Sequence, residues 1–152
     1  MKLPDDSKEF VELLTAHGVE FVVVGGRAVA FHGYPRFTAD VGLLVRPSAE
    51  NGRRILKALD AFGFGKLDLS AESFADPDQV VQLGRAPNRI DLMTGLSGLA
   101  FDEVWAARVE DASDGLEVAV ISRELLIRNK RATGRTQDLA DAERLEARPP
   151  EG

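Results

Sequence analysis

The segment from Phe21 to Val45 constrains the fold of this chain more than any other part of it. It opens with an apolar run, Phe21–Val24, that stops at the glycine pair 25–26. A short apolar run closed by glycine is typical of a buried strand. We expect a short helix over residues 27–31 and a second strand over residues 38–45. Two strands joined through a glycine turn and a short helix therefore form the predicted centre of the sheet.

Three residues of this segment are unusual for purely structural positions. Gly25 and Gly26 let the backbone turn sharply and approach a ligand, although a tight turn alone explains them as well. Asp40 is a carboxylate in an apolar strand, which is costly unless it is paired, hydrogen-bonded or bound to a metal. Strand residues alternate between faces, so Asp40 shares its face with Gly42, and a mid-strand glycine often marks close approach of a ligand. A cap or a salt bridge remains the alternative for Asp40.

The rest of the chain alternates predicted helices and strands. Helices are expected over residues 5–17, 48–62, 70–74, 101–108, 123–133 and 137–147, and strands over residues 79–83, 89–93 and 116–121, with a hairpin turn at 85–88. The alternation in 116–121 favours a half-exposed edge strand. The sequence thus predicts an α/β (α+β) fold: a mixed, partly antiparallel sheet of about five strands, flanked by helices and followed by a C-terminal helical pair. We expect a single domain over residues 1–148 and a disordered tail at 149–152.

Further charged residues join this pattern in the second half of the chain. Asp91 lies in a predicted strand between apolar neighbours that face the opposite way. Lys130 closes one predicted helix, and Arg135, Asp138 and Asp141 follow on the next. The two aspartates are three residues apart and share a helix face, where an Arg–Asp pair that only stabilises the helix is the alternative explanation.

At these residues the sequence resembles the nucleotidyltransferase superfamily with its polymerase-β-like fold. It looks most like small bacterial nucleotidyltransferase-like proteins related to abortive-infection and toxin–antitoxin enzymes. The family carries Gly-Gly or Gly-Ser after its first strand, Asp-x-Asp on the next strand and a third acid on a later one. Gly25 and Gly26, Asp40 and Asp91 fit this order, whereas Gly42 stands in place of the second acid.

The resemblance implies a metal-dependent transfer of a nucleoside monophosphate from an NTP to a hydroxyl group. The acceptor would be an RNA end such as that of tRNA, a protein or a small molecule, and an active relative would hold two Mg²⁺ ions. The implied site comprises Asp40 and Asp91 as catalytic metal ligands, Gly25, Gly26, Lys130 and Arg135 at the phosphates, and Asp138 and Asp141 in support. Since glycine offers no side-chain ligand, Gly42 predicts weak or absent transfer. The alternative is a degenerate component of a toxin–antitoxin pair that binds a nucleotide or a partner such as its cognate antitoxin.

Composition narrows these possibilities. The 152 residues include no cysteine, which excludes disulfides and thiolate metal sites, and carry a net charge of −6. We expect a cytoplasmic protein without a membrane partner, since no apolar run approaches the roughly 20 residues of a membrane helix and the N-terminus lacks a secretory signal. The charge is uneven, because residues 123–135 hold five basic side chains and one acidic one. Such a patch can hold a phosphate or an RNA end, or simply face solvent.

Overall fold

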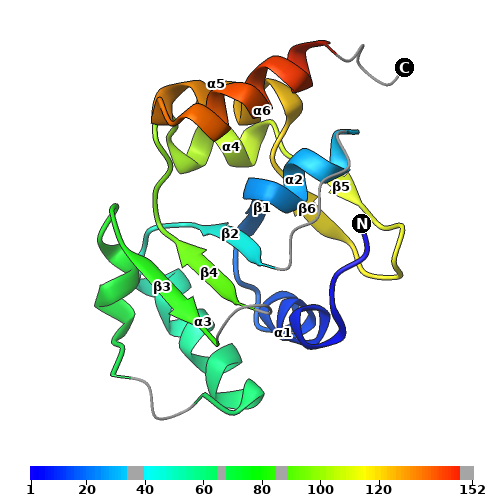
Figure 1. Cartoon of the computed structure of the whole chain (residues 1–152). Helices are drawn as coiled ribbons and strands as arrows, with labels where there is room; N and C mark the ends of the chain where they lie inside the picture. Colours follow the sequence, from blue (N-terminus) through cyan, green and yellow to red (C-terminus); the bar gives the residue numbers. More distant parts are fainter. Residues whose placement is uncertain (34–39, 65–67, 85–88, 148–152) are drawn as a thin grey trace.

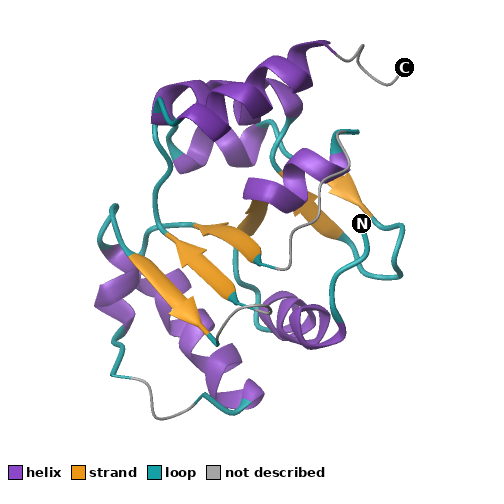
Figure 2. Cartoon of the chain, in the orientation of Figure 1, coloured by secondary structure: helices purple, strands orange, loops and turns teal. Residues whose placement is uncertain are grey.

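The computed structural model describes residues 1–33, 40–64, 68–84 and 89–147. Six strands form one mixed sheet that helices flank, so the predicted fold class is confirmed, with one strand more than expected (Figures 1 and 2). The strands are β1 (Phe21–Val24), β2 (Val41–Val45), β3 (Val80–Leu83), β4 (Ile90–Met93), β5 (Val109–Asp111) and β6 (Val118–Val120). The helices are α1 (Asp5–Ala16), α2 (Gly25–Phe31), α3 (Ala49–Phe62), the 3-10 helix η1 (Ala71–Ala75), α4 (Phe101–Ala106), α5 (Arg123–Thr133) and α6 (Thr136–Ala147).

The sheet runs in the order β3-β4-β2-β1-β6-β5. Three sequential pairs are antiparallel, β1 with β2, β3 with β4 and β5 with β6, and the parallel pairs β1–β6 and β2–β4 join them. In the centre, Gly42 is in register with Val24 of β1 on one side and Asp91 of β4 on the other. The ladder therefore places the glycine turn after β1 beside the two acid-bearing segments.

Most helices begin and end within a residue of the predicted bounds, but α2 begins at Gly25, two residues earlier than expected, and α4 ends at Ala106, two residues earlier than expected. The ends of α3 and α5 have identifiable local causes. The hydroxyls of Ser48 and Ser122 accept hydrogen bonds from backbone N–H groups at the starts of α3 and α5. Gly63 and Gly134 follow these helices in the left-handed conformation that favours glycine. Helices α4, α5 and α6 lie together at one end of the molecule, while α1 and α3 lie at the other (Figure 1).

Two strand predictions are corrected. Residues 116–121 were expected at a sheet edge, but β6 lies between β1 and β5 and all three of its residues are buried. The missed strand β5 forms that edge instead. Its sequence, Val-Glu-Asp, is largely exposed and lacks the apolar alternation by which strands are recognised.

Some predictions concern parts of the chain outside the described residues. The first two residues of the predicted strand 38–45, the turn 85–88 and the tail 149–152 are among them. In the described part, β2 begins at Val41, so Asp40 immediately precedes the strand rather than lying within it.

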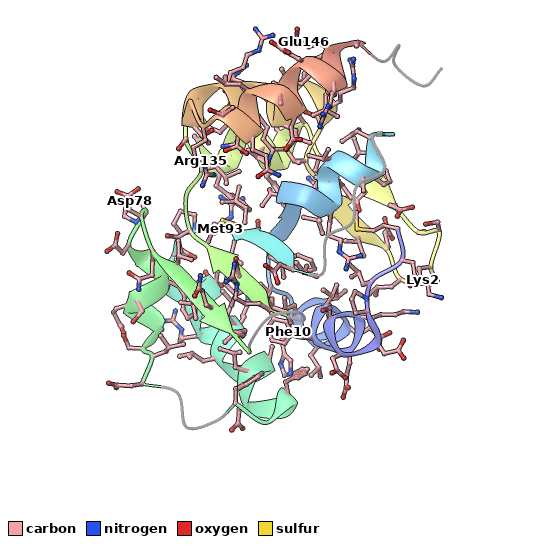
Figure 3. All side chains as sticks on the ribbon, in the orientation of Figure 1. Lys2, Phe10, Asp78, Met93, Arg135 and Glu146 are labelled. Atoms are coloured by element: carbon pink, nitrogen blue, oxygen red, sulfur yellow. The ribbon has the colours of Figure 1, made fainter. Side chains whose placement is uncertain are left out.

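The core lies between the sheet and the helices at its two ends. Phe10 of α1 stacks on Phe62 of α3 with 5.3 Å between ring centroids, and Leu126 and Leu145 of the C-terminal helices are fully buried. Figure 3 shows Met93 on the sheet and Arg135 on the helical pair, on the two sides of the cleft analysed below. Among the described residues, no helix combines the length and apolar character needed to cross a membrane.

Candidate nucleotide-binding site

Asp40 and Asp91 lie side by side although 50 residues separate them in the chain. The parallel pairing of β2 with β4 sets Gly42 opposite Asp91, so Asp40 is offset from Asp91 by two residues, about 7 Å along the strand. One guanidinium touches both carboxylates: Nη2 of Arg89 lies 3.3 Å from Oδ2 of Asp40, and its Nε lies 3.0 Å from Oδ1 of Asp91. Two acids from distant segments are thus close enough to act on one ligand.

Gly42 lies between these acids and β1 and has no side chain. A Cβ atom built on Gly42 would lie 3.0 Å from the Cε atom of Met93 and 3.6 Å from Cγ2 of Val24. The closest neighbour is thus the flexible end of a methionine. The space beside the acid pair that a side chain at position 42 would use is therefore occupied by an apolar methyl group, which rotation of Met93 can withdraw.

The glycine pair forms the turn from β1 into α2. Gly25 has a φ of +71°, a left-handed conformation that L side chains rarely adopt. Apart from its chain neighbours and the nearby backbone of α2, no heavy atom of the described residues lies within 4 Å of a Cβ built there, so the backbone at Gly25 faces open space. A ligand can therefore approach this turn closely.

A buried ionic cluster joins α5 to α6. Nζ of Lys130 lies 3.0 Å from Oδ1 of Asp138 and 3.5 Å from Oδ2 of Asp141. The other oxygen of Asp138 accepts hydrogen bonds of 2.7 Å from the Thr133 hydroxyl and from Nε of Arg135. The Arg135 side chain is 77% exposed, whereas that of Lys130 is 10% exposed. Lys130 thus fixes the acids inside the helical pair, and Arg135 extends from them into solvent.

These contacts set the ionisation of Asp138. Burial alone raises the pKa of its carboxyl, but the hydrogen bonds from Thr133 and Lys130, the charge of Lys130 and the hydrogen bond from Arg135 outweigh it. The pKa of Asp138 therefore lies below its ordinary value, and the group is a carboxylate at neutral pH.

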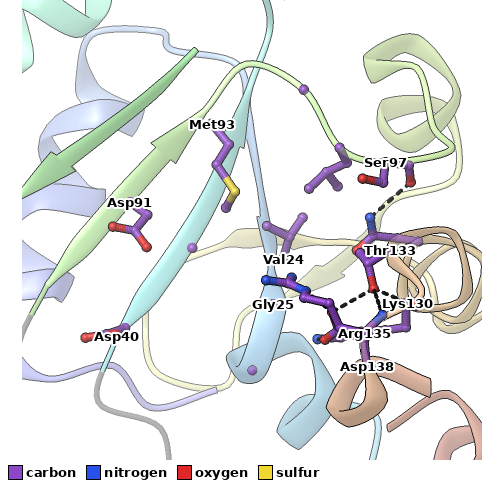
Figure 4. Close-up of a pocket in the computed structure, with 15 residues that line it drawn as sticks. Val24, Gly25, Asp40, Asp91, Met93, Ser97, Lys130, Thr133, Arg135 and Asp138 are labelled. Atoms are coloured by element: carbon purple, nitrogen blue, oxygen red, sulfur yellow. Dashed lines mark hydrogen bonds and ion pairs between the residues drawn. The ribbon is translucent and has the colours of Figure 1, made fainter. Parts of the chain in front are cut away.

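The acid pair, the glycine turn and the ionic cluster border one cleft of about 340 Å³, within the size range of small-molecule pockets (Figure 4). Asp40 and Asp91 lie at one side of it, and Lys130, Arg135 and Asp138 at the other. Asp141, 1% exposed, contacts Lys130 without lining the cleft. The predicted site residues that line the cleft are Gly25, Gly26, Asp40, Gly42, Asp91, Lys130, Arg135 and Asp138.

Two residues that line the cleft, Asn129 and Thr133, and Arg89 next to its acid pair were not predicted from the sequence. Asn129 donates a hydrogen bond to the backbone oxygen of Ser97, which ties α5 to the loop after β4. Thr133 belongs to the Asp138 cluster, and Arg89 bridges the acids. Arg89 alone carried a usable sequence signal, because it lies two residues before Asp91 and thus on the same strand face.

The oxygen donors fit one Mg²⁺ ion better than two. Mg²⁺ commonly binds one or two carboxylates together with substrate phosphates. Asp40 and Asp91 can provide the carboxylates if Arg89 moves aside. A two-ion site needs a further bridging acid, and Gly42 supplies none. Among the described residues, no group of three or more His, Cys, Asp or Glu side chains is arranged to hold a metal ion.

The basic stretch 123–135 is largely neutralised by acids from neighbouring helices. Arg128 pairs with Glu103 of α4, and Arg131 pairs with Glu146 of α6. Lys130 and Arg135 are engaged by the cluster around Asp138. The positive charge seen in the sequence therefore does not form an unopposed patch for a polyanion.

Comparisons with known proteins agree with this architecture. The chain is similar to the crystal structure of a “putative nucleotidyltransferase (TM1012)” from Thermotoga maritima, with a TM-score of 0.57 and 16% identity over 95% of this chain and 93% of the other. At that identity the similarity concerns the fold alone. A search of curated proteins gave no match. The model of a family described as “Nucleotidyl transferase of unknown function (DUF2204)” matches residues 4–151. This chain belongs to that nucleotidyl transferase family.

Proposed function

We propose that the cleft binds a nucleoside triphosphate with Mg²⁺ and that the chain transfers the nucleoside monophosphate to a hydroxyl group only weakly. The observation that supports the proposal is the arrangement of the cleft. Two carboxylates lie at one side, an exposed arginine at the other, and a glycine turn opens between them. Triphosphate and metal carry opposite charges, and this cleft offers a partner for each.

Each residue has a distinct part in this proposal. Asp40 and Asp91 would hold the metal ion, which neutralises phosphate charge and polarises the reacting oxygens. The open backbone at Gly25 and Gly26 would let the triphosphate pass close to the sheet. Arg135 would contact a phosphate through its exposed guanidinium, and Lys130 would add positive charge from the cleft wall. Asp138 and Asp141 would hold both cations in place.

Gly42 is the reason to expect weak transfer. If the missing carboxylate and the ion it would hold stabilised the transition state by about 4 kcal/mol, their loss would lower the rate on the order of 10³-fold. The retained acids, turn and basic residues would still bind the nucleotide.

The transfer prediction is tested by incorporation of radiolabelled nucleotide in the presence of Mg²⁺. We expect little or no incorporation by the natural chain and a gain on Gly42→Asp, because only the mobile end of Met93 crowds position 42. The double variant G42D/D40N is the control and should lose the gain. Robust incorporation by the natural chain that Asp40→Asn abolishes would contradict the proposed impairment. An unchanged rate and unchanged metal affinity in G42D would contradict the site assignment.

A second candidate is a non-catalytic component of a toxin–antitoxin pair that binds a nucleotide or its cognate protein partner. The absence of an acid at position 42 favours it. Thermal-shift measurements with ATP, CTP, GTP and UTP, each with and without Mg²⁺, separate the candidates. A shift that needs both nucleotide and metal supports the proposed site, whereas no shift with any of them supports a partner-binding protein.

A further inference from the structure

Arg89 contacts both proposed metal ligands at once. Its Nη2 atom lies 3.3 Å from Oδ2 of Asp40 and donates a hydrogen bond of 3.3 Å to Oδ2 of Asp91, while Nε lies 3.0 Å from the other oxygen of Asp91. The guanidinium therefore occupies the position between the two carboxylates that a shared cation would take.

The backbone fixes Arg89 in this place. Its carbonyl oxygen accepts a 3.0 Å hydrogen bond from the N–H of Val41, which extends the β2–β4 ladder by one residue beyond Ile90. Arg89 is thereby set opposite Asp40 across the ladder and on the same strand face as Asp91. Its contact with both acids follows from strand register rather than from a chance rotamer at the surface.

Electrostatics explain what this contact achieves. Two carboxylates close together repel each other unless a cation lies between them. Mg²⁺ would need carboxylate oxygens at about 2.0–2.1 Å, and a guanidinium between the same oxygens leaves no room for it. Arg89 and a metal ion therefore exclude each other from this position.

We propose that Arg89 is an internal cation that holds Asp40 and Asp91 together when no metal is bound and competes with a divalent ion for them. This inference rests on the metal-binding part of the proposed function. It adds a positioning residue that lowers metal affinity independently of Gly42. The chain then carries two separate obstacles to metal binding, a missing ligand at position 42 and an occupied space at Arg89.

The competition is tested on the full chain with Mn²⁺ alone, by the electron paramagnetic resonance signal of the free ion. Arg89→Gln should bind Mn²⁺ at least tenfold more tightly than the natural chain. The Mn²⁺ affinity of Arg89→Lys should lie between those of the natural chain and Arg89→Gln, since a single ammonium group cannot reproduce all three contacts of the guanidinium. The matched control is Arg54→Gln, which removes an arginine paired with Glu50 on α3 and should leave the affinity unchanged.

Metal-free thermal unfolding gives a second readout. Asp40→Asn should lower the melting temperature in the natural background, because it removes a partner of Arg89. The same change should lower it by less in the Arg89→Gln background, because the contact between Asp40 and Arg89 is already lost there. The Mn²⁺ affinity of the same variants distinguishes this coupling from a purely structural role of Arg89.

The outcomes separate this inference from the function on which it rests. Equal Mn²⁺ affinity in the natural chain and Arg89→Gln, or an equal effect of Asp40→Asn on the melting temperature in both backgrounds, overturns the role of Arg89 alone. No Mn²⁺ binding by any variant overturns the inference together with the metal-binding role of Asp40 and Asp91. The thermal-shift measurements with nucleotides test separately whether the cleft binds a nucleoside triphosphate.

Discussion

Two glycines shape the cleft for different physical reasons. Gly25 is required by its backbone, since its φ of +71° strains any L side chain even where space is open. Gly42 has no such constraint, and a side chain there meets chiefly the end of Met93. A substitution at position 25 therefore disturbs the turn, whereas a substitution at position 42 adds a group to the cleft.

Replacement of Gly25 by alanine should affect both stability and ligand binding. Gly25→Ala forces alanine into the left-handed region and should lower the free energy of unfolding by about 1–2 kcal/mol, measured by urea denaturation. Gly115→Ala is the matched control, because Gly115 has a φ of +78° and equally open surroundings in the turn between β5 and β6, away from the cleft. Both variants should lose similar stability, but only Gly25→Ala should weaken the nucleotide-induced thermal shift. Equal shifts in both variants would argue against phosphate approach at this turn.

Helices α5 and α6 form a unit whose faces are joined by ionic contacts as well as apolar ones. Lys130 at the end of α5 and Asp138 in the first turn of α6 are both more than 90% buried. Removing one partner of a buried ion pair strongly destabilises the fold, because the remaining charge is then buried without an opposite charge. The helical pair should therefore respond to pH through Asp138.

The variant Asp138→Asn replaces a carboxylate that accepts three hydrogen bonds, from Lys130, Thr133 and Arg135, by an amide group that faces the same donors. It should lower the free energy of unfolding by about 2 kcal/mol at pH 6. Because the folded-state pKa of Asp138 lies below its ordinary value of 3.8, the carboxylate stabilises the fold above that pH and loses this effect as the pH falls through the folded-state pKa.

The difference between the natural chain and Asp138→Asn should therefore be smaller at pH 3 than at pH 6, in urea titrations at both pH values. Glu143→Gln, at an exposed position of the same helix, is the control and should change stability by less than about 0.5 kcal/mol at either pH. A difference that stays constant between the two pH values would contradict the contribution assigned to the ionised carboxylate.

Elements with strong local signals could be predicted, and contacts that depend on register could not. Apolar periodicity together with Ser and Gly caps predicted the helices, and short apolar runs predicted the central strands. Asp91 was recognised because it is an acid between apolar neighbours. Strand β5 was missed because its exposed residues carry no pattern, and its partner β6 was therefore placed at the edge. Arg89 was missed as a bridge because its contact with Asp40 exists only in the β2–β4 register, which the sequence does not encode locally.

The charge of the molecule as a whole argues against extensive contact with nucleic acid. The net charge is −6, and Arg128, Lys130 and Arg131 of α5 are paired with acids of α4 and α6. Affinity for RNA depends on the number of phosphates that a protein neutralises, and this number sets the salt dependence. An acceptor RNA would therefore have to be held by few contacts near the cleft.

Binding of a fluorescent RNA hairpin should consequently be weak and depend little on salt. We expect the slope of log K against log salt to be no steeper than about −2 between 50 and 200 mM, measured by fluorescence anisotropy. The variant E103Q/E146Q removes the partners of Arg128 and Arg131 and should steepen the slope. A slope near −5 for the natural chain would mean that the ion pairs open to bind RNA, contrary to this expectation.

The pairing of Gly42 with Val24 and Asp91 has an evolutionary consequence. The main-chain ladder that spaces the carboxylates is complete without a side chain at position 42, so the strand pairing does not depend on which residue stands there. The glycine codons GGU and GGC differ from the aspartate codons by one nucleotide. A lineage can therefore lose and regain an acid here by a point mutation without rebuilding the protein around it.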